Sequence, residues 1–429
     1  DFCINGMIWP DRTPHPAMWE FKKLLQPAEF ELIPPREEGS VSLRLRNLRD
    51  FAPLEGYELR YWVSRNGVQG EERTAAVPDI GAGEQAELTL SLESGAERSQ
   101  TPGAGPPRGT TETLLTVSLR LLEGDRLVPA GHEVAWEQWL LPSAARVAPG
   151  VVDWPGVTGV GIAPRGGAGE ENGLDGGPSS ETAELTLTLT EGIPRLGGPI
   201  EIAGPALSLW RAPTENDLIR RMAGQDGKPG ARWIADGLNK LSGRWSVLGE
   251  QTDGASQVTL EGVYTVDSQE PARCRLTLGP LEDWGWQRLL VEVDLAESLL
   301  DLPRIGLRFD LPKGFEALSW YGRGPQESYP DRANGYPLGY WTSTVADQYV
   351  PYIVPQEHGG HSDTRLLRVS TPKEPGAEAG SSRSFTVSAA ALESFHFSAL
   401  HAAPEDLDEL THTYQIEPRE QKIGRASCR

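Results

Sequence analysis

The sequence has little that could form disulfides, membrane spans or a nucleic-acid surface. Its three cysteines, Cys3, Cys274 and Cys428, are too few and too far apart for a disulfide framework or a zinc site, which favours a reducing compartment and a cytoplasmic location. No apolar run is long enough to span a bilayer and no secretory signal peptide is evident, so we expect no membrane partner. Lys and Arg are scattered, and a formal net charge of −21 repels phosphate backbones, so we expect no nucleic-acid partner.

The start of the chain is typical of a strand, a loop and a helix. Phe2 to Met7 is a short apolar segment, and Ile8 to Pro16 is a turn-rich connection. Pro16 to Leu25 has the pattern of an amphipathic helix, with Thr13 as a possible cap. One strand and one helix cannot bury their own faces, so we expect neighbouring strands and helices upstream of Asp1.

The next part of the chain alternates between apolar and polar residues in the manner of β-strands. Asn66-Gly67 is the sharpest turn signal, because both residues tolerate the positive φ of a tight turn. Glu93 to Thr110 is polar and rich in Gly and Pro, and we expect a solvent-exposed loop there. Short strands at this density predict a sandwich of the immunoglobulin type. The predicted strands are Glu29–Ile33, Val41–Leu48, Tyr57–Ser64, Ala86–Leu92, Leu114–Leu122 and Val134–Leu141.

The remainder predicts a second all-β domain, which is too large for one simple sandwich. Pro142 to Thr182 is rich in Gly, Pro and Ala, and we interpret it as a linker that merges into a loose domain edge, with the boundary near residue 145. Helical patterns of any length are few. Strand-like runs include Ala183–Thr190, Gln257–Val266, Cys274–Leu278, Arg288–Val293, Ile305–Phe309 and Ser384–Ala389.

Four motifs, in the same order along the chain, resemble the β-galactosidases of glycoside hydrolase family 2. The first is DFCINGMIWPDRTPHP at residues 1–16, and the second is GHEVAWEQW at Gly131–Trp139. The third is LWRAPTEND at Leu209–Asp217. The fourth begins as WYGRGPQESYPD at Trp320–Asp331 and continues through Arg332 to YIVPQEHGGHSDTR at Tyr352–Arg365.

This resemblance implies a mainly β fold in three parts. Residues 1–28 would be the last βα unit of a TIM barrel, the (β/α)8 catalytic domain, residues 29–144 an immunoglobulin-like β-sandwich, and residues 145–423 a large galactose-mutarotase-like β-supersandwich. Relatives continue into further strands after Thr411–Pro418, whereas this chain continues as EQKIGRASCR. We therefore expect residues 424–429 to be an artefactual tail, which resequencing of the source DNA would test.

The resemblance also implies a retaining β-galactosidase, which cleaves terminal non-reducing β-D-galactose from lactose-type substrates. Retaining glycosidases need two carboxyl groups, one as acid and base and one as nucleophile. In this family both are glutamates on earlier barrel strands, upstream of Asp1, and no acidic residue of this chain lies in a matching motif. We therefore assign no catalytic residue here, and expect the Mg²⁺ ligands to lie upstream as well.

Phe2 and Asn5 are the candidate binding residues that the resemblance places in this chain, at the end of the last barrel strand, where barrel enzymes have their active sites. Phe2 would offer its backbone carbonyl and Asn5 its side-chain oxygen to a Na⁺ ion that also contacts the galactose 6-hydroxyl. Asn5 would touch the sugar directly as well. Oxygen ligands suit such a hard cation. Without the resemblance, Asn5 would be interpreted as a turn residue before Gly6.

Other charged motifs are better explained by structure than by chemistry. Asp11-Arg12 and Pro14-His15-Pro16 suggest turn rigidity and a local ion pair, since nothing places a nucleophile or carboxylate beside His15 to make it a catalytic base. The third motif, from Arg211 to Asp217, suggests an ion-pair cluster. In relatives the loop that follows it moves on ligand binding, but Leu218-Ile219-Arg220 replaces the usual continuation here, so a mobile role is not assigned.

Two further patterns could suit a metal site and a sugar-stacking surface. His358, His361 and Asp363 have a spacing that could suit zinc, but the intervening glycines indicate a sharp loop and no fourth ligand is visible, so polar loop contacts are preferred. The sequence has 13 tryptophans, and indole rings can stack on sugars, but large β-sandwich cores use Trp heavily too. Trp136 and Trp139 are expected in a strand, whereas Trp320-Tyr321 could face a surface groove.

Two functions remain open from the sequence. The main hypothesis is the C-terminal fragment of a β-galactosidase, inactive alone, whose partners are the β-galactoside substrate and the missing N-terminal part of the same enzyme, with a homo-oligomeric parent. The alternative is an accessory or complementing carbohydrate-binding subunit without catalysis of its own.

Overall fold

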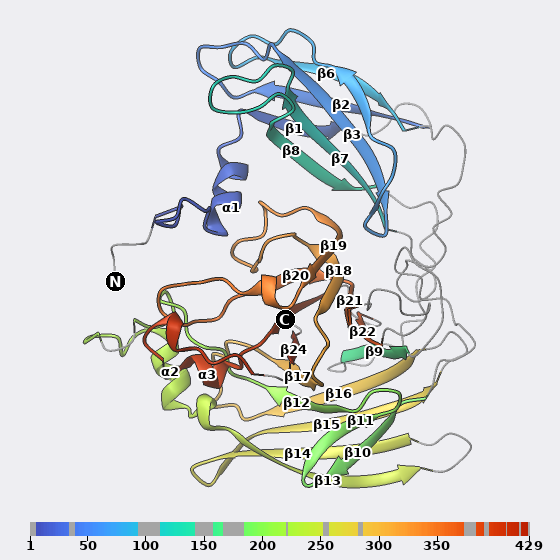
Figure 1. Ribbon diagram of the computed structural model, residues 1–429, viewed down its shortest axis with the longest axis vertical. Coiled ribbons are helices and arrows are strands. Elements are labelled where there is room, and N and C mark those ends of the chain that lie inside the picture. The colour runs from blue at the N-terminus through green and yellow to red at the C-terminus, as the bar shows by residue number, and fades with distance from the viewer. Residues whose placement is uncertain are drawn as a thin grey trace.

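A computed structural model shows a mainly β protein, as the sequence predicts, with 48% of residues in strands and 9% in helices. None of its described helices has both the length and the hydropathy needed to cross a bilayer. Figure 1 shows a small sandwich at one end, a larger β domain at the other, and α1 (Ala17–Leu24) beside their junction. The structure describes residues 6–33, 39–92, 112–141, 158–165, 184–219, 222–251, 257–281, 286–372, 383–389, 394–408, 410–419 and 422–427.

The predicted N-terminal helix is present as α1, but the cap differs from the prediction. Pro16 precedes the helix and makes no side-chain cap. Thr13 does not cap the helix, because its backbone N–H and its hydroxyl both donate to Asp11 Oδ1, at 2.9 and 2.7 Å. Thr13 therefore closes the preceding turn, and the same bonds lower the pKa of the Asp11 carboxyl.

The small sandwich consists of two antiparallel sheets, and the six strands predicted for it are confirmed. The apolar side of each strand faces a shared core that includes Leu43, Leu59 and Val117, all fully buried. One sheet has the order β1-β2-β6 and the other the order β4-β3-β7-β8, with β5 paired to β3. The strands are β1 (Ala28–Ile33), β2 (Ser40–Asn47), β3 (Tyr57–Arg65), β4 (Val68–Gln69), β5 (Arg73–Ala76), β6 (Gln85–Ser91), β7 (Thr113–Leu121) and β8 (Glu133–Leu140).

The large domain contains a seven-stranded and a nine-stranded sheet that share one core. Leu196 and Phe309 of the smaller sheet belong to the same buried cluster as Leu260 and Leu289 of the larger sheet. The smaller sheet has the order β10 (Thr186–Thr190), β11 (Ile193–Gly197), β12 (Ile202–Ser208), β17 (Gly306–Leu311), β24 (Lys422–Ser427), β23 (Phe395–Leu400) and β20 (Gly360–Thr364). The larger has the order β13 (Ser242–Gln251), β14 (Gln257–Val266), β15 (Gln269–Leu281), β16 (Gln287–Leu295), β9 (Thr158–Arg165), β22 (Ser384–Ser388), β21 (Leu366–Ser370), β18 (Ala317–Arg323) and β19 (Leu338–Thr344).

Short helices complete the described part of the large domain. They are α2 (Pro229–Ala235), α3 (Pro404–Asp408) and the single 3₁₀ turns Leu238–Lys240, Ala346–Gln348 and Thr413–Gln415. The six runs predicted as strands in this domain all correspond to strands, namely β10, β14, β15, β16, β17 and β22. This outcome follows from the alternating side-chain pattern of half-buried strands.

The linker interpretation was wrong for one segment. Residues Thr158–Arg165 form β9, which pairs with β16 on one side and β22 on the other, inside the nine-stranded sheet. The Gly and Pro content of the segment suggested a loop. Backbone hydrogen bonds to two neighbouring strands do not depend on side chains, so they can hold such a segment in a sheet. The expected boundary near residue 145 and the predicted loop from Glu93 to Thr110 lie outside the described residues.

The end of the described chain is a central strand. β24 pairs with β17 and β23, so Lys422–Ser427 lies between two strands that are distant from it in sequence. This segment overlaps the residues expected to be an artefactual tail. The pairing shows where this segment lies in the sheet. That residues 424–429 are an artefactual tail stays a prediction, which resequencing would test.

Candidate functional site

The described part of the first motif, residues 6–16, contains a closed turn ahead of α1. The Trp9 N–H donates to the Thr13 carbonyl at 2.8 Å, and the His15 N–H donates to the Met7 carbonyl at 3.0 Å. Arg12 adopts a positive φ of 73° in this turn. Phe2 and Asn5, the predicted sodium and sugar ligands, lie outside the described residues, so their roles stay predictions.

His15 is held in an aromatic stack. Its ring lies 3.5 Å from the Trp9 ring, centroid to centroid, and Tyr352 packs against Trp9 at 5.9 Å. Burial, and then the nearby Arg332 charge, lower the pKa of His15. Among the described residues no carboxylate is bonded to it, which supports the structural interpretation of His15. The expected Asp11-Arg12 ion pair is absent from this described turn, since Asp11 instead binds Thr13.

A buried carboxylate from the fourth motif anchors the residues around this stack. Glu327 is 4% exposed and accepts hydrogen bonds from Arg332 Nη2 at 2.6 Å, from the Tyr352 hydroxyl, and from the Gly359 N–H at 2.7 Å. Burial raises the pKa of Tyr352, and the Glu327 charge adds to this effect. Because both carboxylate oxygens are engaged, Glu327 acts as an anchor that positions Tyr352, and through it the Trp9–His15 stack.

The third motif forms the predicted ion-pair loop and joins the fourth. Arg211 Nη2 lies 2.7 Å from both carboxylate oxygens of Asp217, and Asp217 also accepts from the Thr214 N–H at 2.9 Å. The Glu215 N–H donates to Gln356 Oε1 at 3.3 Å. The interpretation of an ion-pair cluster is therefore confirmed.

The second motif contacts both α1 and the large domain. Lys23 of α1 bonds to Glu137 at 2.9 Å and to the Trp136 carbonyl, and its ammonium lies 4.2 Å from the centroid of the Trp136 ring. Gln138 donates to the Leu338 carbonyl and accepts from the Leu338 N–H, both at 2.9 Å. The side-chain amide of Gln138 thus bonds to both backbone polar groups of Leu338, as a neighbouring strand would, and connects β8 to the first residue of β19.

α1 is also bound to the fourth motif and its continuation. Glu20 accepts hydrogen bonds from the Asn334 side chain at 3.0 Å and the Gly335 N–H at 2.6 Å, and the Tyr336 hydroxyl donates to the Pro16 carbonyl at 2.6 Å. A Cβ on Gly335 would lie 2.6 Å from Glu20 Cα, so this close approach requires glycine.

The possible zinc residues do not converge. His358 Nδ1 lies 2.9 Å from the Gln356 carbonyl, and Asp363 binds the Arg323 guanidinium. His361 bonds to Gln348 at 2.6 Å, and burial lowers its pKa to about 3. No cluster of His, Cys, Asp and Glu suited to a metal occurs in the described residues. The contacts of these three side chains are instead hydrogen bonds and an ion pair with neighbouring loops and strands, as the interpretation of polar loop contacts expects.

The suggestion that Trp320 and Tyr321 face a groove was wrong. Trp320 belongs to the main core, and Tyr321 is 1% exposed. The Tyr321 hydroxyl donates to Glu112 at 2.7 Å, and Arg365 donates to the same carboxylate at 2.9 and 3.1 Å. Tyr321 is buried because Gly67 and Glu112 of the small sandwich lie against it, whereas Trp320 is buried in the core of the large domain itself.

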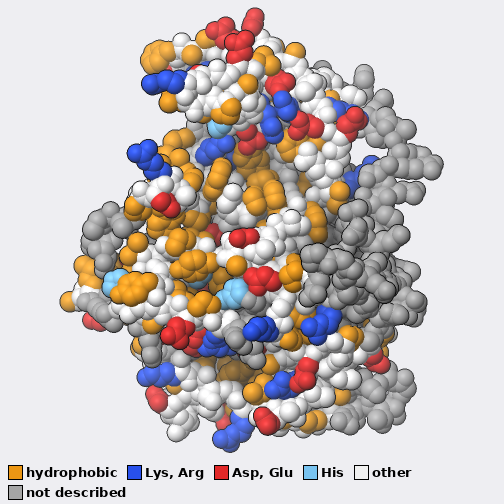
Figure 2. All heavy atoms as spheres, viewed as in Figure 1, with side chains coloured by type: hydrophobic (Ala, Val, Ile, Leu, Met, Phe, Trp, Pro, Cys, Tyr) orange, Lys and Arg blue, Asp and Glu red, His pale blue; other side chains and the backbone are white. Residues whose placement is uncertain are grey.

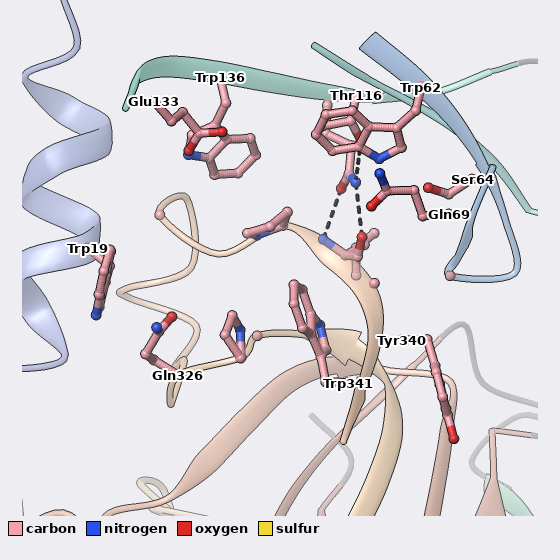
Figure 3. A pocket seen from close by; sticks show the side chains of 18 of the residues that line it. Trp19, Trp62, Ser64, Gln69, Thr116, Glu133, Trp136, Gln326, Tyr340 and Trp341 are labelled. Atoms are coloured by element: carbon pink, nitrogen blue, oxygen red, sulfur yellow. Dashed lines mark hydrogen bonds between the residues drawn. The ribbon is translucent and has the colours of Figure 1, made fainter. Parts of the chain in front are cut away.

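The structure contains a cavity that sequence reasoning missed. It lies where α1, the small sandwich and the loop before β19 meet, and Trp19, Trp62, Trp136 and Trp341 line it. In Figure 3, Trp62 and Trp136 lie on the side of the small sandwich, whereas Trp341 lies on the opposite side. The sequence places Trp136 in a strand, which indicates that its side chain lies on one face of a sheet. No sequence pattern connects Trp136 to Trp19 or Trp341, because these residues are distant in the chain.

Comparison with known protein families yields two matches. A family described as the β-galactosidase small chain matches residues 180–427, and one described as β-galactosidase domain 4 matches residues 24–142. These two ranges cover most of the small sandwich and most of the large domain.

Individual relatives agree with the family matches. A β-galactosidase of Arthrobacter sp. (strain B7) is 29% identical over 454 aligned residues, covering 100% of this chain and 41% of that protein. A β-galactosidase of Vibrio cholerae is 30% identical, covering 97% of this chain and 36% of that protein. This chain therefore spans about two fifths of the length of the curated relatives it matches, and it corresponds to their C-terminal part.

Proposed function

This chain belongs to the family of the β-galactosidase small chain, and from that premise we propose that it is the C-terminal part of a retaining β-galactosidase. The parent protein would hydrolyse terminal non-reducing β-D-galactose residues, with lactose-type molecules as substrates. The chain alone would not hydrolyse them, because it lacks a motif for the required pair of carboxyl groups.

The contacts that connect the four motifs and α1 support this proposal. Trp9 and His15 pack against Tyr352, Tyr352 bonds to Glu327, and Gln356 reaches the third motif. The second motif contacts α1 through Lys23. Residues separated by up to hundreds of positions thus brace one short turn and helix. Such bracing is what a site at the end of a barrel strand needs from its surroundings.

The outer face of α1 supports a protein partner. Phe21, Leu24 and Leu25 are 45%, 66% and 64% exposed, while Trp19, Glu20 and Lys23 of the same helix contact the rest of the chain. A helix with apolar side chains on its unpacked face normally covers another element. We propose that the N-terminal, catalytic part of the same enzyme packs here.

The sodium site is part of this proposal. A backbone carbonyl at Phe2 and an amide oxygen at Asn5 are neutral oxygen donors of the kind that hard cations accept. A bound Na⁺ would polarise the galactose 6-hydroxyl. Asn5 would hold that hydroxyl and orient the sugar, and the braced turn from Met7 to Pro16 would hold Asn5 in place. Mg²⁺ would be bound by the N-terminal part.

Complementation tests the proposed function. The purified chain is assayed on a chromogenic β-galactoside alone, and again after co-expression with the preceding barrel segment from the same gene. We expect that the chain alone does not hydrolyse the galactoside, and that the complex hydrolyses it with retention of the anomeric configuration. Robust turnover by the repurified chain alone would show that its catalytic carboxylates are not missing. An Asn5→Ala complex should have a raised KM for the galactoside and a weaker dependence on Na⁺.

An accessory carbohydrate-binding subunit is the second candidate function. It is favoured by the aromatic cavity near α1, and it predicts sugar binding without restored catalysis in the complementation assay. We also propose a cytoplasmic location and a homo-oligomeric parent. Fractionation of the source cells and light scattering of the complex test these two points.

A further inference from the structure

We propose that the cavity between α1, the small sandwich and β19 binds a neutral mono- or disaccharide. Its volume of about 390 Å³ lies at the lower end of the range for small-molecule sites. Strands β3, β7 and β8 form one wall, and residues Gly324 to Trp341 form the other. Figure 2 shows hydrophobic side chains gathered on the face where the two β domains meet.

Aromatic rings line this cavity from several elements. Trp62 extends from β3, Trp136 from β8, Trp341 from β19 and Trp19 from α1 (Figure 3). All four are only half-buried, unlike the tryptophans of the cores, such as Trp320. Faces of indole rings carry negative charge density, which attracts the weakly positive C–H groups of a sugar ring. Rings on both sides of one gap can contact both faces of a pyranose.

Polar groups with unused hydrogen-bonding capacity lie between these rings. Ser64 is 4% exposed, and its hydroxyl makes no hydrogen bond to any other described residue. The side-chain amides of Gln69 and Gln326 line the same space and are likewise unbonded within the described chain. A hydroxyl and two amides that line the cavity can bond to a ligand with hydroxyl groups, whereas a purely apolar ligand would displace water from them without replacing its hydrogen bonds.

The charges of the cavity favour a neutral ligand. Lys22 and Glu133 are the two charged residues that line it, and Glu133 already accepts a hydrogen bond from Ser118 at 2.6 Å. These two charges are of opposite sign, so the lining offers no net charge to compensate the desolvation of an ionic ligand. Amides and hydroxyls paired with indole rings therefore match sugar hydroxyls and C–H faces best.

The cavity is rigid, which lowers the entropic cost of binding. Gln138 bonds to Leu338 across its floor, and it also donates to Thr116 at 3.0 Å. Trp341 donates its indole N–H to the Gly322 carbonyl at 3.0 Å, which sets the angle of that ring. Walls that are held by bonds within the protein are preorganised for a ligand.

Binding to the whole 429-residue chain tests this proposal without any catalytic activity. Lactose and cellobiose are titrated by calorimetry, and saturation-transfer NMR identifies the sugar protons in contact with aromatic rings. We expect weak binding of a neutral disaccharide, and weaker binding of galacturonate. Trp62→Ala should lower the affinity about tenfold, with Trp62→Phe between the two, because the larger ring face is lost. Gln69→Ala, at an exposed position, should lower it without affecting folding.

Two matched controls separate this site from other sources of binding. Tyr414→Ala removes an 83% exposed aromatic ring outside the cavity and should leave the affinity unchanged. Asn5→Ala should also leave it unchanged, since Asn5 belongs to the proposed galactose site. The proposal is overturned if no neutral sugar binds, or if Asn5→Ala abolishes binding while the folded Trp62→Ala and Gln69→Ala variants retain it. Complementation by the barrel segment is unaffected by either result, so the two proposals can fail separately.

Discussion

The tip of the Asn66-Gly67 hairpin should be a sensitive point of the contact between the two β domains. Both residues have positive φ, 48° and 81°. The Gly67 carbonyl accepts a hydrogen bond from the Tyr340 N–H at 3.1 Å. A Cβ on Gly67 would lie 2.4 Å from Tyr321 Cδ2, closer than any real contact. Tyr321 cannot move away easily, because it is buried and bonded to Glu112.

Gly67→Ala should therefore destabilise the chain through two separate effects. A non-glycine residue at this φ costs about 1–2 kcal/mol. Overlap with a buried ring adds about 1–3 kcal/mol if the domains stay docked. Gly131→Ala is the matched control, since Gly131 has a φ of 77° in the same sandwich and a Cβ there meets nothing within 4 Å. The control has the backbone cost without the overlap.

Urea unfolding followed by near-UV and far-UV circular dichroism measures the difference between the two variants. We expect Gly67→Ala to lose about 1–3 kcal/mol more than Gly131→Ala. If the domains separate instead, small-angle scattering should show a larger radius of gyration for Gly67→Ala alone. Equal stability and equal radius in the two variants would refute the argument that the hairpin tip is packed against Tyr321.

Three further predictions concern buried charge, pH and assembly. Glu357→Gln leaves the buried Arg304 guanidinium without its ion-pair partner and should cost about 3–5 kcal/mol in urea unfolding, whereas Glu270→Gln in an exposed pair should change little. Burial lowers the pKa of His361 to about 3, so the unfolded chain takes up a proton that the folded chain excludes. This contribution to stability is complete above about pH 6.5 and is lost as the pH falls, by up to about 1.4 kcal/mol per pH unit. In the His361→Gln variant, the urea midpoint of unfolding should therefore fall less steeply as the pH is lowered. An unchanged dependence of the midpoint on pH would contradict this role of His361. Leu24→Glu on the outer face of α1 should reduce activity restored by the barrel segment, while Phe51→Glu, at a 98% exposed position, should not; equal activity would argue against a partner on α1.

Local pattern was sufficient for much of the secondary structure. Strand alternation depends on residues two positions apart, so β1 to β3 and β14 could be predicted within a residue or two. The Asn66-Gly67 turn followed from backbone preference alone. β9 was missed because its residues Thr158–Arg165 have no strong alternating pattern, and its stability in the sheet comes from neighbours at both edges.

The sequence by itself determined the mainly β class, the small sandwich and the family resemblance carried by four motifs. Tertiary structure decided which of those motifs touch, that Tyr321 is buried, and that Trp19, Trp62, Trp136 and Trp341 line one cavity. The physical reason is the distance along the chain over which each kind of interaction acts. Propensity and alternation act between neighbours in the chain, whereas burial and cavity shape depend on side chains brought together from positions up to hundreds of residues apart.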